Sequence, residues 1–329
     1  MIMEISGIGN NKIIYYINEL GYSDGYYKFD NHRLPQAYID NLNWYSLSYE
    51  TFSSQIIGEN NILIFQSPTN NELKKLESII PFLKTNSIFI TQESNIFDWF
   101  DWTAQEQELY IKILSECKAF LYHSEYDKQV MKAFCSNFIK YPGCTNLSLQ
   151  DPKLYTQGSY ILIPGPIKRY QRGMITHKLA SDTVREIPIY SMDYNPPKNY
   201  PLSFPDAYKL NNINLLDRQD KNGWLGLIYN SKFGIDIYRE FSGGNVSLEF
   251  GSLATPLIRN IHLDTQRDIF PDLSFEFTDY ENIKNAIKLL INDKDFYEEM
   301  SKKALINTKE KYNSELITSN FNKELTQLL

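Results

Sequence analysis

Cysteine and histidine are scarce in this chain of 329 residues. The three cysteines, Cys117, Cys135 and Cys144, have no CxxC spacing, and one of them stays unpaired in any disulfide scheme. This usage is typical of a reducing compartment, so we expect a cytoplasmic protein. The four histidines are scattered and no HExxH motif or Cys/His cluster occurs. We therefore expect no metal site.

Positive charge is also in deficit. Lysine and arginine number 33 against 40 aspartates and glutamates, which gives a net charge of −7. A protein held to phosphate backbones by counterion release needs a basic footprint, so this balance argues against nucleic acid as a partner. The sequence has no apolar run of 18 residues, and Met1–Lys12 lacks a basic segment followed by an apolar one. Both absences argue against a membrane span and a secretion signal.

Two well-known catalytic signatures are missing as well. The chain contains no GxxxxGK[ST] and no GxSxG, which argues against P-loop and α/β-hydrolase chemistry. Apolar residues, in contrast, are plentiful: 42% of the chain is hydrophobic and 14% aromatic. That content predicts a folded protein, and the length predicts two domains rather than one core.

The first half of the chain alternates between strand and helix patterns. After a short apolar run at its start, Ile13, Ile14, Ile17 and Leu20 have helical spacing, which predicts a helix within Asn10–Leu20. The further strands expected are 61–65, 87–91 and 119–122, and the further helices are 72–83, 105–117 and 125–134. Short β-branched strands alternating with helices predict an α/β fold with a parallel sheet covered on both faces.

The alternation restarts after a break rich in proline and glycine between Tyr141 and Gly158. The domains expected on either side of this break are 1–150 and 151–311, and the last 30 or so residues are expected to form one or two amphipathic helices. In the second half the strands expected are 160–163, 187–190, 224–229 and 256–258, and the helices are 174–184, 246–252 and 283–291. Two α/β halves of similar size follow from this pattern.

Ligands of parallel sheets bind outside the carboxyl ends of the strands, so the loops after strands hold the candidate site residues. Gly7 and Gly9 follow the first apolar run and would let backbone approach a substrate at a helix N-terminus, or simply form a tight turn. The loop after strand 160–163 holds Gly165 and three cations, Lys168, Arg169 and Arg172. Cations at a helix N-terminus are suited to a diphosphate; the alternative is a solvated basic turn.

A glycine pair precedes the predicted helix 246–252. Gly243, Gly244 and Asn245 would expose free N–H groups to phosphate oxygens at the helix N-terminus. Glu249, one turn further on, could accept hydrogen bonds from both hydroxyls of a ribose. The alternative for Glu249 is a surface carboxylate behind an ordinary turn.

Two carboxylates follow the strand 87–91. Glu93 and Asp98 would lie at its carboxyl end, where a carboxylate is suited to act as a general base. Helix capping is an equal alternative for Asp98, and Ser124 is expected to cap the helix 125–134.

Taken in order, these segments resemble a glycosyltransferase of the GT-B fold, which has two Rossmann-like domains with a cleft between them. Within that class the chain resembles bacterial glucosyltransferases that extend glycans on serine-rich-repeat adhesins, and their galactofuranosyltransferase-like relatives. More distantly it resembles phage β-glucosyltransferases that modify DNA. The segments that carry the resemblance are Asn11-Lys12, Glu19–Gly21, Ile64–Thr69, Gly226–Tyr229 and Leu253–Ile258.

The resemblance implies a hexosyltransferase that moves a sugar from a nucleotide diphosphate sugar, a UDP-sugar first of all, to a glycan or glycoprotein. It implies no separate cofactor, because the nucleotide sugar is the donor substrate. The second domain would bind the donor through the Gly165–Arg172 loop, Gly243–Asn245 and Glu249. The first domain would bind the acceptor near Gly7, Gly9 and Asp98, and the helix 312–329 would return to it.

The chain also departs from those families. Phe241 stands where many retaining enzymes have a second glutamate, and Gln92 stands near the phage enzymes' base, so Glu93 is the expected substitute. The stereochemical outcome therefore stays open. Two other functions stay open as well, a DNA glucosyltransferase and a catalytically silent subunit with a protein partner, and so does a homo-oligomer.

Overall fold

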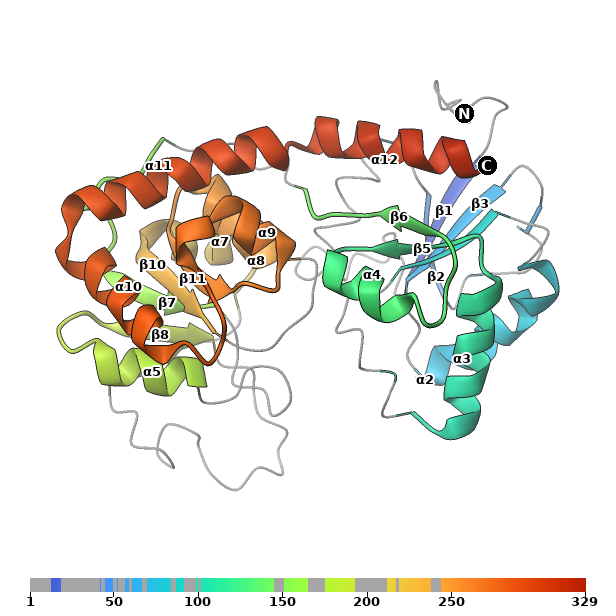
Figure 1. Cartoon of the computed structure of the whole chain (residues 1–329), viewed down its shortest axis with the longest axis horizontal. Coiled ribbons are helices and arrows are strands. Elements are labelled where there is room, and N and C mark those ends of the chain that lie inside the picture. Colours follow the sequence, from blue (N-terminus) through green and yellow to red (C-terminus); the bar gives the residue numbers. More distant parts are fainter. Residues whose placement is uncertain are drawn as a thin grey trace. The chain divides into compact units, whose positions relative to one another are not determined.

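The structure is a computed structural model that contains two six-stranded parallel sheets (Figure 1). The residues it describes are 13–18, 42, 45–49, 52, 57–58, 61–66, 70–83, 87–91, 99, 102–144, 151–164, 175–192, 212–216, 219–237 and 244–329. Within that part the chain divides into two compact units. One comprises the described residues up to Cys144 together with Ser314–Leu329, and the other those from Asp151 to Asn313. The predicted α/β class, with two parallel sheets, is confirmed.

The first sheet has the strand order β2-β1-β3-β4-β5-β6. Its strands are β1 (Ile13–Asn18), β2 (Tyr45–Ser48), β3 (Asn61–Gln66), β4 (Ser87–Thr91), β5 (Ala119–Tyr122) and β6 (Phe138–Lys140). The helices of this unit are α2 (Asn70–Leu76), the 3-10 helix η4 (Glu77–Phe82), α3 (Ala104–Glu116), α4 (Glu125–Met131) and α12 (Ser314–Leu328). All neighbouring strands run parallel.

Alternate residues of these strands enter two different cores, as the pleat of a strand requires. Leu63 and Phe65 of β3 pack with residues of α2, α3 and α4. Ile62 and Ile64 pack on the other face, where Phe321 and Leu325 of α12 contribute. A parallel sheet must be covered on both faces. In the described part of this unit, the helix that covers the second face comes from the C-terminal end of the chain (Figure 1).

Two helices of the first unit begin with reciprocal caps. Thr103 accepts from the amide of Glu106 and Glu106 bonds back to Thr103, which starts α3. Ser124 and Asp127 do the same at the start of α4, immediately after β5. Such boxes satisfy amides that the first helical turn leaves without partners. The capping role predicted for Ser124 is confirmed.

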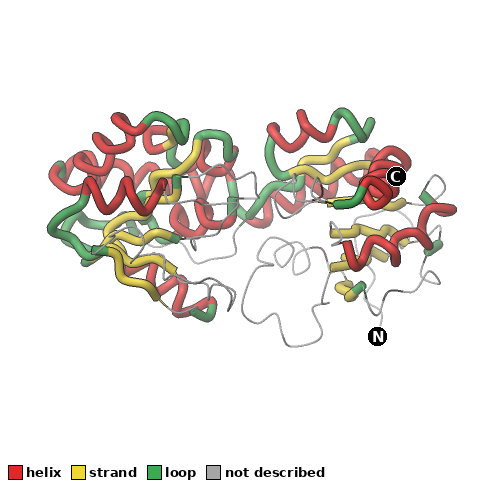
Figure 2. The backbone as a smooth tube through the Cα atoms, turned by 90° about the horizontal axis from the view of Figure 1, so that it is seen from below, coloured by secondary structure: helices red, strands yellow, loops and turns green. Residues whose placement is uncertain are grey.

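The second sheet has the strand order β12-β11-β10-β7-β8-β9. Its strands are β7 (Tyr160–Ile163), β8 (Ile189–Met192), β9 (Ile213–Leu216), β10 (Ser231–Asp236), β11 (Leu257–Asn260) and β12 (Ser274–Phe275). The helices are α5 (Ile175–Thr183), α7 (Lys221–Asn230), α8 (Asn245–Ser252), α9 (Asp264–Ile269), the 3-10 helix η6 (Pro271–Leu273), α10 (Tyr280–Asn292) and α11 (Lys294–Lys311). Helices lie on both faces of this sheet (Figure 2).

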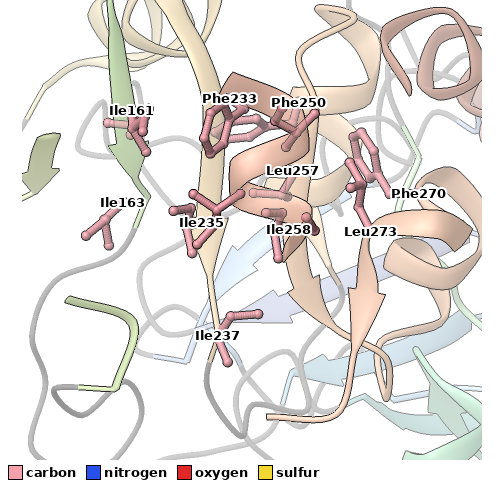
Figure 3. Packing of buried hydrophobic residues seen from close by; sticks show 14 of the residues in the cluster. Ile161, Ile163, Phe233, Ile235, Ile237, Phe250, Leu257, Ile258, Phe270 and Leu273 are labelled. Atoms are coloured by element: carbon pink, nitrogen blue, oxygen red, sulfur yellow. The ribbon is translucent and has the colours of Figure 1, made fainter. Parts of the chain in front are cut away.

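The core of this unit forms where α8 lies against β10 and β11. Figure 3 shows Phe250 of α8 beside Phe233 of β10, with Leu257 of β11 next to them. A Cβ atom at Gly234 would overlap the Phe250 ring and the Leu257 side chain. Glycine in this strand therefore allows α8 to approach the sheet closely.

Two predicted elements are wrong. Residues 13–18, expected in a helix, form β1, which pairs with β2 and β3 and contributes Ile17 to one core and Ile14 and Tyr16 to the other. A short apolar run fits the period of a helix as well as that of a strand, and the β-branched and aromatic residues of this run favour a strand. Residues 224–229, expected as a strand, belong to α7, whose N-cap Asp220 accepts from the amide of Gly223 at 2.7 Å. The strand in this region is β10.

Candidate functional site

The winding of the second sheet reverses between the neighbouring strands β7 and β10. In open parallel sheets this reversal creates the crevice where ligands bind, beyond the carboxyl ends of the strands. After β10 the chain continues through Ile237 and re-enters the described part at Gly244, where α8 begins. The amino end of α8 is therefore the part of the candidate site beyond β10 that lies within the described residues.

Gly244 is the N-cap of α8 and has φ 71° and ψ 24°, in the left-handed region. A Cβ atom at this position would overlap Thr265 Oγ1 of α9. Both observations require glycine here. The N-cap glycine has no side chain to cap the first turn, and the N–H groups of that turn and the helix dipole favour an anion in front of Asn245.

Glu249 lies in the middle of α8 and is only 4% exposed. The indole Nε1–H of Trp224, from α7, donates to its Oε2 at 2.8 Å. The alternative of a surface carboxylate is therefore wrong. This contact orients the Glu249 carboxylate, and a carboxylate offers about four acceptor positions in all.

Trp224 is a site residue that the sequence analysis missed. The residues around it were expected as a strand, and that expectation gave no reason to place Trp224 beside α8. Its signal was Asp220, four residues earlier, a favoured N-cap residue one turn before the apolar run.

A buried polar cluster lies under the first turn of α8. Arg259 Nε in β11 is 3.0 Å from Asp236 Oδ2 in β10, and both side chains are almost fully buried. Arg259 Nη1 donates to Ser247 Oγ at 3.2 Å, and Ser247 Oγ donates to Gln266 Oε1 at 2.9 Å. Gln266 Nε2 in turn donates to the carbonyl oxygens of Leu257 and Leu273. The cluster ties α8 to β10, β11 and α9.

The remaining predicted site residues lie outside the described residues. They are Gly7, Gly9, Glu93, Asp98, Gly165, Lys168, Arg169, Arg172 and Gly243. The reason given for Gly7 and Gly9, a helix directly after them, is lost because residues 13–18 form β1. Of the predicted set, the structure brings together Gly244, Asn245 and Glu249 on α8.

No protein-family model and no curated protein matches the sequence. Solved structures do match. HepE from Anabaena in complex with UDP-glucose aligns with a TM-score of 0.69 at 10% identity, over 95% of this chain and 99% of that one. Sucrose-phosphate synthase from Thermosynechococcus elongatus aligns with a TM-score of 0.64 at 14% identity, over 90% and 78% of the two chains. These neighbours are GT-B proteins. The chain has the GT-B fold.

A third GT-B neighbour is S. aureus TarM, a variant of which was solved in complex with fondaparinux, alpha-GlcNAc-glycerol and UDP. It aligns with a TM-score of 0.64 at 13% identity, over 83% of this chain. This chain spans just over half of TarM, with 57% of that protein covered. In the described residues of this GT-B chain, no helix is both long enough and apolar enough to cross a membrane.

Proposed function

We propose that the chain is a glycosyltransferase that moves a sugar from a nucleotide diphosphate sugar, preferably a UDP-sugar, to a glycan or glycoprotein acceptor. The observation that carries the proposal is the alignment with HepE, a protein solved with UDP and with UDP-glucose, over nearly the full length of both chains. The placement of Glu249 and the amino end of α8 at the carboxyl edge of the second sheet supports the same assignment.

The reaction breaks the bond between the sugar C1 and an oxygen of the β-phosphate, and forms a bond between C1 and an acceptor hydroxyl oxygen, which loses its proton. The main requirement is to stabilise negative charge on the departing diphosphate. The amides of the first turn of α8 supply part of this stabilisation, and Arg169, Arg172 and Lys168 are the proposed cations. Glu93 is the proposed base that takes the acceptor proton.

The donor is tested by the thermal unfolding of the full chain in the presence of UDP-, GDP-, CMP- and TDP-sugars. A ligand that binds the native state raises Tm, by mass action. We expect UDP-sugars to raise Tm at concentrations where the others do not, and slow release of UDP from the bound donor. If none of the four classes raises Tm or binds in calorimetry, the proposed function is wrong.

Glu249→Gln is expected to weaken UDP binding by about 1–2 kcal/mol, because it removes the charge that strengthens hydrogen bonds to the ribose hydroxyls. The amide oxygen of glutamine can still accept from Trp224 Nε1, so the stability of the fold should change little. Glu249→Ala is expected to weaken binding further and to lower the free energy of unfolding by about 1–3 kcal/mol, since it leaves that buried indole N–H without its acceptor. Isothermal titration and urea unfolding measure the two effects.

A ribose contact is separated from general electrostatics by a 2′,3′-dideoxy analogue of UDP. Wild type and Glu249→Ala should bind the analogue with similar affinity, because the partner hydroxyls are absent. Glu281→Gln, an exposed carboxylate at the start of α10, is the matched control. If Glu249→Ala weakens the binding of the dideoxy analogue as much as it weakens the binding of UDP, Glu249 does not hold the ribose.

A further inference from the structure

A buried arginine lies directly beneath the candidate site, although it is too deep to serve a substrate itself. Arg259 is 1% exposed, and its partner Asp236 is its register neighbour on the adjacent strand. Burying two charges removes their hydration, and a buried ion pair is often no more stabilising than apolar residues of the same size. Stability alone therefore gives no sufficient reason for a charged pair at this place in the core.

The cluster joins the elements that form the site. Asp236 ends β10, the strand next to the point where the winding reverses. Arg259 spans from that carboxylate to Ser247, the third residue of α8. Ser247 also donates to Gln266 of α9. Gly244, the N-cap of α8, packs against Thr265, which also belongs to α9. The guanidinium thus fixes the first turn of α8 relative to the ends of two strands.

The same helix is held from a second direction. Ser247 and Glu249 are two residues apart, and two residues of an α-helix turn through about 200°, so their side chains leave α8 on nearly opposite sides. Glu249 bonds to Trp224 of α7, whereas Ser247 bonds to Arg259 below. Rotation of α8 about its own axis would break both contacts.

We infer that Arg259 is a positioning residue for the nucleotide diphosphate of the donor. Through Asp236 and Ser247 it sets where the first-turn amides of α8 and the Glu249 carboxylate stand. The planar guanidinium can donate in two directions at once, which a lysine ammonium on the same strand would do less rigidly. The ligand part of this inference rests on the proposed function; the positioning of α8 does not.

The test removes both charges together, in the variant Asp236→Leu/Arg259→Met of the full chain. Removing both avoids an uncompensated buried charge, so Tm should stay close to that of wild type. We expect amide hydrogen exchange in the first turn of α8 to become at least about tenfold faster, and the Kd for UDP to rise about tenfold, since small displacements of binding groups are costly. Asp272→Asn/Lys303→Gln, which removes an exposed ion pair of the same unit, should change neither.

Ser247→Ala provides a second variant that keeps the ion pair intact. It removes the bond from Arg259 to α8 together with the bond from Ser247 to Gln266, and we expect faster exchange in α8 and weaker UDP binding, as in the double variant. If the pair has only a structural role, a double variant with the Tm of wild type should also have the α8 exchange rates and the UDP affinity of wild type. That result would overturn the inference. If wild type binds no UDP-, GDP-, CMP- or TDP-sugar, the proposed function is wrong, and the exchange rates of α8 without ligand still decide whether Arg259 positions the helix.

Discussion

Leu325→Ala is expected to lower the free energy of unfolding of the first unit by about 2–5 kcal/mol, because it opens a cavity in a fully buried contact. Leu325 is 0% exposed and packs with Phe321 of α12 against the face of the first sheet that Ile62 and Ile64 line. The loss follows from the architecture, since a parallel sheet has no solvent-facing side and α12 supplies this part of its cover.

The matched control for Leu325 lies on the same helix. Leu316 of α12 is 46% exposed, so Leu316→Ala should change the stability by less than about 0.5 kcal/mol. Urea unfolding followed by hydrogen exchange reports each unit separately, through the amides of β3–β5 and of β10–β11. We expect the first set alone to lose protection in Leu325→Ala. Equal effects of the two alanine variants would mean that α12 does not form part of the first unit's core.

Lys153→Met is expected to remove a strong pH dependence of stability. Lys153 lies in the segment before β7, and its ammonium donates to the carbonyl oxygens of Tyr229 and Ser231 and to Thr255 Oγ1. These three acceptors are neutral, and burial lowers the pKa of Lys153 from 10.5 to about 7. Burial therefore raises the free energy of the charged Lys153 side chain in the folded state, whereas the unfolded chain leaves the same charge in water.

The sign of the effect follows from proton binding. Between the folded and the unfolded pKa the unfolded chain binds more protons, so stability rises with pH. From about pH 7 to about pH 9.5 the free energy of unfolding of wild type should gain about 3 kcal/mol relative to Lys153→Met, at ~1.4 kcal/mol per pH unit. Urea unfolding at several pH values measures this slope, and Lys309→Met, an exposed lysine of α11, is the control. Parallel pH profiles for wild type and Lys153→Met would contradict the prediction.

Much of the fold follows from local sequence patterns. The buried strands β3, β4, β5 and β7 were predictable because each is a short run of β-branched and aromatic residues between polar segments. The amino end of α8 was predictable because a glycine pair precedes an apolar helix. The amphipathic pattern of the final helix was also readable, whereas the sheet that it covers was expected only from the resemblance to GT-B proteins.

Other features depend on distant partners and could not be read locally. A run such as Trp224–Tyr229 fits either period, and what makes it a helix is its cap at Asp220 and the burial of Trp224 and Ile228 on one face. Arg259 stands at the end of an apolar stretch and looks like a surface residue. Its burial depends on Asp236, 23 positions earlier, in a strand that the sequence analysis placed wrongly.

The central claim is that the second unit binds a nucleotide diphosphate sugar at the amino end of α8, and the most direct test is hydrogen exchange of the full chain with and without UDP-glucose. The account predicts that saturating UDP-glucose slows the exchange of amides in Asn245–Ser252 of α8 and around Trp224 of α7, because the ligand engages the first-turn amides and Glu249. Unchanged exchange in α8 at a concentration where calorimetry records binding would place the ligand elsewhere and contradict the claim.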